Sequence, residues 1–156
     1  MTTSEAESRD LPTLGTHCHR KVRFSQAQIS EFARLTGDAN PVHADEAAAR
    51  RAHHGRIIAS GQQTAANMIG LAATHCARGD DGSTRDVLCL NFNFAFKSPV
   101  FADEDLDLRW SVSAVEWSEH LGGAICQLDG AASADGRICL VARGTLLVKK
   151  PAEGAA

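Results

Sequence analysis

The sequence lacks any apolar run long enough to span a bilayer, and its first residues, MTTSEAESRDLPT, are polar and acidic without an apolar signal core. It also lacks a cluster of basic residues: these are scattered along a chain whose formal net charge is -3. Nucleic-acid and membrane binders usually concentrate positive charge. We therefore expect a cytoplasmic protein that binds neither nucleic acid nor membranes.

Spacings typical of disulfide frameworks and metal sites are missing as well. The cysteines are odd in number, far apart and mostly inside apolar runs, which favours reduced, buried thiols; they are Cys18, Cys76, Cys89, Cys126 and Cys139. The histidines of 17–19 and 53–54 have no paired C-x-x-C or H-E-x-x-H spacing to support them. We expect no metal and no cofactor.

What is present suits one ordinary domain. The chain has 156 residues, of which 44% are hydrophobic, enough for a single core and too few for two. Residues 1–12 and 151–156 are small and polar, so we expect flexible ends flanking a domain over 13–150.

Helical patterns dominate the first half of the chain. Ser25 and Gln28 form a capping-box pattern before a helix that stops at Gly37, and a short helix is expected over 47–52. Ser60 can then cap a long helix over 61–77 that is apolar on nearly all sides and must be buried.

Strand patterns dominate the second half. Apolar alternation predicts strands over 87–97, 106–115, 124–131 and 138–148, with Asp135-Gly136 as a two-residue hairpin and an earlier strand over 17–24. The sequence thus predicts an α+β domain in which an antiparallel sheet of about five strands curls around the long helix. The first amides of that helix, near Gly61, would offer hydrogen bonds to an oxygen that gains negative charge.

Chemistry is most concentrated in the turn after the first helix. Gly37 can end that helix, and Pro41 keeps Asn40 out of the helical region, so the turn is stiff. A stiff turn can direct Asp38 and His43 into one small volume, as general acid–base catalysis requires. Ordinary turn chemistry with a structural histidine explains the same residues equally simply.

This turn, Gly37-Asp38-Ala39-Asn40-Pro41-Val42-His43-Ala44-Asp45, resembles the hydratase signature of the MaoC-like, (R)-specific enoyl-CoA hydratase family. Residues 24–35, 55–64 and 97–106 resemble, in the same order, the helix before the signature, the approach to the central helix and a strand-connecting segment. The resemblance implies a hotdog fold, a sheet wrapped around a central helix, and pairing as a homodimer or higher homo-oligomer.

The resemblance also implies roles for individual residues. Asp38 and His43 would jointly hold the water that adds to an α,β-unsaturated acyl thioester, and the Gly61 amide would polarise the thioester carbonyl. Asn40 would orient the turn next to the substrate. The substrate would be a thioester of coenzyme A or of acyl-carrier protein.

The chain departs from the family just at this helix. Many members have His-Gly-Met, whereas this chain has Ser60-Gly61-Gln62, followed by Gln63. Ser60, Gln62 and Gln63 are therefore candidate substrate-binding residues for a short, branched or polar acyl group. The alternative is an N-cap at Ser60 and a solvated first turn.

We therefore expect a hydro-lyase, an enoyl-CoA hydratase that also runs as a 3-hydroxyacyl-thioester dehydratase. Two alternatives stay open. A hotdog thioesterase would share fold and substrate but release free thiol. A non-catalytic hotdog subunit would only pair with an active partner chain.

Overall fold

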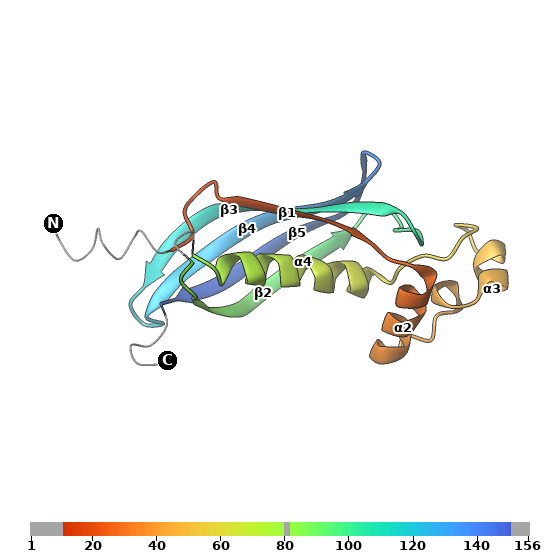
Figure 1. Ribbon diagram of the computed structural model, residues 1–156, viewed down its shortest axis with the longest axis horizontal. Coiled ribbons are helices and arrows are strands. Elements are labelled where there is room, and N and C mark those ends of the chain that lie inside the picture. Colours follow the sequence, from red (N-terminus) through yellow and green to blue (C-terminus); the bar gives the residue numbers. More distant parts are fainter. Residues whose placement is uncertain (1–10, 80–81, 151–156) are drawn as a thin grey trace.

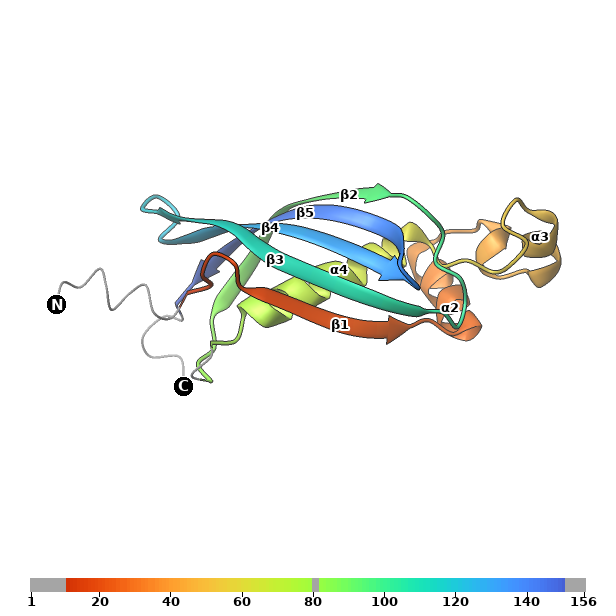
Figure 2. The ribbon, with the colours of Figure 1, turned by 90° about the horizontal axis from the view of Figure 1, so that it is seen from above.

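One curved antiparallel sheet organises the computed structural model, which describes residues 11–79 and 82–150. Its strands in chain order are β1 (His17–Arg23), β2 (Asp86–Phe96), β3 (Asp105–Ser118), β4 (Gly123–Ala134) and β5 (Arg137–Lys149). They lie in the order β1-β3-β4-β5-β2, so β1 and β2 form the two edges (Figure 2).

The predicted turn at Asp135-Gly136 is confirmed and sets the register between β4 and β5. Both residues have positive φ angles, 50° and 77°, as the two-residue hairpin requires. Ala134 consequently lies opposite Arg137. Strands β3 and β4 run beyond the ranges expected for them, because backbone pairing continues past the alternating apolar residues, for example between Trp117 and Ala124.

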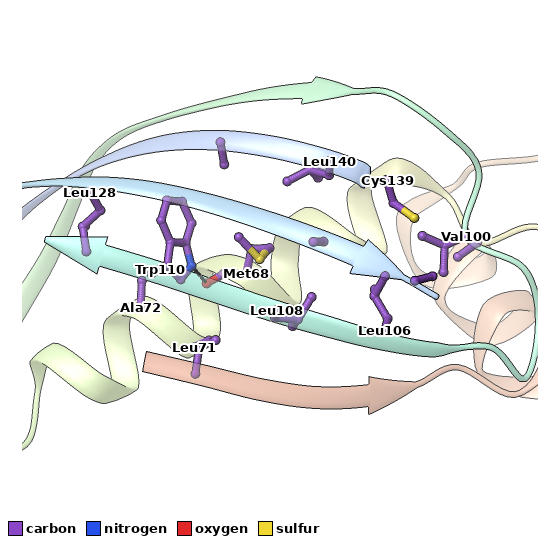
Figure 3. Packing of buried hydrophobic residues seen from close by; sticks show 14 of the residues in the cluster. Met68, Leu71, Ala72, Val100, Leu106, Leu108, Trp110, Leu128, Cys139 and Leu140 are labelled. Atoms are coloured by element: carbon purple, nitrogen blue, oxygen red, sulfur yellow. Dashed lines mark hydrogen bonds between the residues drawn. The ribbon is translucent and has the colours of Figure 1, made fainter. Parts of the chain in front are cut away.

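Helix α4 (Gly61–Cys76) lies along the sheet, which curves around it (Figure 1). Its core-facing side chains include Met68 and Leu71, which belong to one buried apolar cluster with residues of the sheet. Trp110 of β3 is almost fully buried, and its indole N–H donates to the Met68 carbonyl at 2.7 Å (Figure 3). The single α+β domain with the hotdog arrangement is thus confirmed.

Three short helical elements extend beyond one end of the sheet (Figure 1): α2 (Gln26–Thr36), the 3-10 turn η2 (Pro41–His43) and α3 (Glu46–Arg51). The capping box that opens α2 is present in both directions between Ser25 and Gln28. Gly37 ends the same helix with φ 71°. Since the first residue of α4 lies on this side, the turn after α2 meets the N-terminus of the central helix.

The cysteines are free, and most are buried as expected. Cys76, Cys126 and Cys139 are buried and Cys18 is half-buried, whereas Cys89 is exposed on the edge strand β2. Burial raises the pKa of Cys76 to about 12 and that of Cys126 to about 11, so both stay protonated thiols near neutral pH.

The expected flexible ends lie mainly outside the described residues. Of the first segment the structure describes Leu11, which packs against the core, and Pro12, which is buried. No helix in the described part of the chain is long and apolar enough to cross a membrane.

Candidate active site

The end of helix α2 fixes the position of Asp38. Gly37 takes the left-handed conformation, and the next amide, that of Asp38, donates to the Ala33 carbonyl at 2.9 Å. The carboxylate is held in turn, because Oδ1 accepts from the Asn40 amide at 3.1 Å. Oδ2 is left to face the interior of the turn.

His43 ends the 3-10 turn and is 5% exposed. Its Nδ1 lies 2.7 Å from the Ile58 carbonyl oxygen, and a carbonyl only accepts, so Nδ1 carries the proton. The Ile58 amide donates to the Val42 carbonyl at 3.3 Å, and this bond connects the backbone at Ile58 to the 3-10 turn η2. In the neutral ring the other nitrogen, Nε2, is therefore an acceptor.

The two side chains converge as the turn geometry predicted. His43 Nε2 lies 3.4 Å from Asp38 Oδ2, and the two side chains are 7% and 24% exposed. Both residues line a cavity of about 480 Å³ that can hold a small molecule. A carboxylate and an imidazole placed in this way can share one water molecule and move its protons.

The N-terminus of α4 borders the same cavity. Gly61, Ser60 and Gln62 all line it, and the Gly61 N–H donates to no other backbone group in the described residues. It is one of the orphan amides at a helix start, where the helix dipole adds partial positive charge. An oxygen in the cavity can accept from it.

Gly61 also packs closely against an aromatic ring. A Cβ built on it would lie 2.6 to 2.9 Å from three ring carbons of Phe96, the last residue of β2. A side chain at this position would force that ring, which is 57% exposed, to move. The aromatic ring thus lies against the start of the helix and forms part of the cavity wall.

Arg137 holds the wall formed by the connection between β2 and β3. Its guanidinium donates to the Pro99 carbonyl at 2.6 Å, to Ser98 Oγ at 3.1 Å and to Glu104 Oε1 at 2.5 Å. Burial alone would lower the pKa of Arg137, but the Glu104 carboxylate and the Cys139 sulfur together outweigh it and the pKa is raised. Because Ser98 and Pro99 line the cavity, this ion pair shapes it.

Two predicted substrate-binding residues are not brought to this cavity. The Asn40 side chain caps η2 by accepting from the Val42 amide at 3.5 Å, and the residue is exposed. Gln63 lies two residues beyond Gly61, hence on another face of α4. It borders a separate cavity between α2 and α4, where its Nε2 is 3.5 Å from the Gln28 carbonyl.

Other cavity residues were not predicted from the sequence. Thr64 lies one turn after Gly61 and is 2% exposed, and Phe96 and Lys97 come from the end of β2. The remaining ones are His54, Ile58, Ala59, Ser98, Pro99, Val100, Cys139 and Leu140. Of these, only Thr64 is indicated by a pattern in the sequence, its i, i+3 spacing from Gly61 within the predicted helix.

Metal-binding residues do not gather here. In the described part of the chain, no group of three or more His, Cys, Asp or Glu side chains is placed to hold a metal ion. The residues that meet are an acid–base pair and a backbone donor.

Known proteins share the family and the fold of this chain. A model of the MaoC like domain matches residues 10–121, which is well over half of the chain. The chain belongs to the MaoC-like domain family. This MaoC-like protein is 28% identical over 102 residues to the (R)-specific enoyl-CoA hydratase of Aeromonas caviae. The matched region covers 65% of this chain and 72% of the hydratase.

Solved structures share the MaoC-like fold. An (R)-hydratase structure from A. caviae superposes with a TM-score of 0.76 at 24% identity, covering 90% of this chain and 98% of that one. A structure of the complex named HadBC, a 3R-hydroxyacyl-ACP dehydratase from Mycobacterium tuberculosis, superposes with a TM-score of 0.72 at 20% identity. The match covers 88% of this chain and 98% of that one. Both likenesses are at the level of the fold.

Proposed function

We propose that this MaoC-like protein is an (R)-specific enoyl-CoA hydratase that also works in reverse as a 3-hydroxyacyl-thioester dehydratase. The observation that carries the proposal is the 3.4 Å approach of Asp38 Oδ2 and His43 Nε2 beside a cavity that also holds the Gly61 amide. An acid–base pair and an oxyanion donor at one cavity are what hydration of an enoyl thioester needs.

The hydrogen bond to Ile58 explains how a water molecule would be oriented. Because His43 Nδ1–H donates to that carbonyl, the neutral ring presents a lone pair at Nε2, and Asp38 presents a second acceptor. A water between them can donate one O–H to each. Its own lone pair then points away from the pair and toward the substrate carbon.

The Gly61 amide would stabilise the negative charge that develops on the thioester oxygen during the reaction. When the thioester carbonyl accepts from this N–H, electron density moves from the C2=C3 bond toward the carbonyl oxygen, and C3 becomes electrophilic. The water oxygen bonds to C3, one member of the pair takes a water proton, and a proton is delivered to C2. Dehydration reverses these steps, and no atom is gained or lost other than water.

The lining residues favour a short or polar acyl group. At the buried end of the cavity lie Ser60, Thr64, Val100, Cys139 and Leu140, each at most 6% exposed. The carrier, coenzyme A or acyl-carrier protein, would enter at the exposed end beside Gln62 and Lys97. The R configuration of the product is proposed from the name of the A. caviae relative, and homodimers or higher homo-oligomers are proposed with it.

The test is hydration of crotonyl-CoA or a short branched analogue, followed at the enone absorbance. We expect Asp38→Asn and His43→Ala each to lose about 10²- to 10⁴-fold in rate while remaining folded. Matched controls are Asp129→Asn and His120→Ala, which change an exposed carboxylate and an exposed imidazole away from the cavity. Unchanged turnover in both site variants would refute the proposal.

Two other outcomes have their own signatures. Release of free thiol, detected with a thiol-reactive dye, would identify a thioesterase. Turnover that begins only when a second polypeptide is added would identify a subunit of a heteromeric dehydratase, the arrangement of the HadBC relative.

A further inference from the structure

An unused hydroxyl borders the buried end of the cavity. Thr64 is 2% exposed and lines the cavity, and its hydroxyl makes no hydrogen bond with any residue that the structure describes. Among the described residues, the fully sealed side-chain atoms without a hydrogen-bond partner are Gln63 Oε1 and Arg85 Nε. The Thr64 hydroxyl is not one of them, so it keeps some exposed surface, and the cavity is the space that Thr64 lines.

A second hydroxyl borders the same cavity. Ser60 is the N-cap residue directly before α4, and it lines the cavity together with Thr64. Ser60 Oγ accepts from the Gln63 amide at 3.3 Å and caps the helix, but its own O–H has no acceptor in the described residues. The acyl side of the site therefore presents two buried donors.

An alkyl chain is a poor match for these donors. Buried hydroxyls that lose water without gaining a partner are destabilising, whereas a substrate oxygen restores the hydrogen bond. Val100 and Leu140 add apolar side chains to the lining. The guanidinium next to these residues, that of Arg137 at 3.3 Å from Cys139 Sγ, is already paired with Glu104, so a carboxylate there would be buried without a free counter-ion.

The helix geometry sets the distance at which the oxygen should lie. Thr64 follows Gly61 by three residues, a rise of about 4.5 Å along the axis. The thioester carbonyl is placed at the Gly61 amide, and the acyl chain then runs along the helix. Such a chain covers this rise with about three or four carbon–carbon bonds. The carbon atom that reaches Thr64 is thus C4 or C5 of the acyl chain.

We propose that Thr64 is a specificity-determining residue that selects acyl thioesters with an uncharged oxygen, a hydroxyl or carbonyl, at C4 or C5. This inference rests on the proposed hydratase activity for its placement of the thioester. It goes further in naming the residue that recognises the acyl group, the chemical class recognised and the position along the chain.

The experiment compares substrates of equal carbon number. Initial rates with 4- and 5-hydroxyhex-2-enoyl-CoA are measured against hex-2-enoyl-CoA for the wild type, Thr64→Val and Thr64→Ser. We expect the wild type to prefer one hydroxylated substrate by about tenfold in kcat/KM, the effect of one hydrogen bond. Thr64→Val should abolish the preference and Thr64→Ser should keep it.

The control variant is Thr74→Val, an exposed threonine on the same helix, which should leave both rates and their ratio unchanged. A wild-type ratio of one, or a ratio that survives in Thr64→Val, would overturn the inference. So would faster turnover of a substrate ending in a carboxylate, such as glutaconyl-CoA. A wild-type ratio of one overturns the inference even if Thr64→Val does not fold.

A binding measurement separates this inference from the proposed activity. Calorimetric titration with saturated 5-hydroxyhexanoyl-CoA and hexanoyl-CoA needs no turnover. Tighter binding of the hydroxylated ligand to the wild type, lost in Thr64→Val, supports the role of Thr64 even if no enoyl thioester is hydrated. Equal binding together with normal hydration overturns the role of Thr64 and leaves the activity in place.

Discussion

Replacing Arg137 by methionine should destabilise the protein far more than the same change at Arg143 on the same strand. Arg137 donates to Glu104, Pro99 and Ser98, and the side chains of the ion pair are only 35% and 20% exposed. Arg143 meets one carboxylate at 3.6 Å, and that pair is 87% and 57% exposed. Methionine keeps most of the aliphatic length in both cases.

The magnitude follows from these contacts. Hydrogen bonds to charged groups contribute about 1.5–3 kcal/mol to stability. The energy of a partly exposed ion pair lies between that of a surface pair and that of a buried one, so Arg137→Met should lower the free energy of unfolding by about 2–3 kcal/mol. Arg143→Met should stay within about 0.5 kcal/mol. In urea the first change should move the unfolding midpoint by about 1 M and the second hardly at all.

A double-mutant cycle with Glu104→Gln tests the cause. If the ion pair carries the effect, the double variant should be much less destabilised than the sum of the two single variants. The same guanidinium holds Ser98 and Pro99 at the cavity wall. The proposed hydratase activity per folded molecule should therefore also be lower in Arg137→Met than in the wild type. Equal midpoints for the Arg137 and Arg143 variants would refute the reasoning.

Three further changes have defined outcomes. Gly61→Ala should lower stability by about 1–3 kcal/mol, since its Cβ would lie within 2.9 Å of the Phe96 ring, and Phe96→Leu in the same chain should restore part of the loss in a urea titration. Trp110→Phe should lose about 1–2 kcal/mol, seen as a lower thermal midpoint, because the hydrogen bond to Met68 is removed. Burial raises the pKa of Cys76 from 9.0 to about 12 and that of Cys126 from 9.0 to about 11, so above pH 9 the unfolded chain releases these protons first and the free energy of unfolding falls. Between pH 8 and pH 10.5 each thiol should remove about 2 kcal/mol of stability in urea unfolding, and Cys76→Ala should lose only the part due to Cys126.

The parts of the fold that the sequence predicts well are those whose cause is local. Ser25 and Gln28 satisfy orphan amides three residues apart, and Gly37 supplies the left-handed conformation that ends the helix, so both helix ends are predictable without knowledge of the rest. The Asp135-Gly136 hairpin is a local matter for the same reason. The convergence of Asp38 and His43 follows from the stiff turn between them.

What the sequence does not predict is the direction in which side chains of α4 point. A helix that is apolar on nearly all sides has no strong polar face, so only the spacing from Gly61 indicates which of Gln62, Gln63 and Thr64 faces the cavity. The directions are set by how α4 packs in the folded protein, where Gln63 lies toward α2 and Thr64 lines the cavity. The partner of His43 at Ile58 and the contact of Phe96 with Gly61 are equally non-local.

The acid–base pair lies where three connecting segments meet, rather than on the sheet itself. The Ile58 amide binds the Val42 carbonyl, the next amide, that of Ala59, binds the Val100 carbonyl at 2.8 Å, and Arg137 binds Pro99. Each segment resembled the family in the sequence, and the backbone bonds explain why such distant motifs occur together. Substitutions in the sheet core should therefore change stability without moving the acid–base pair, whereas loss of one of these cross-links should change the geometry of the pair first.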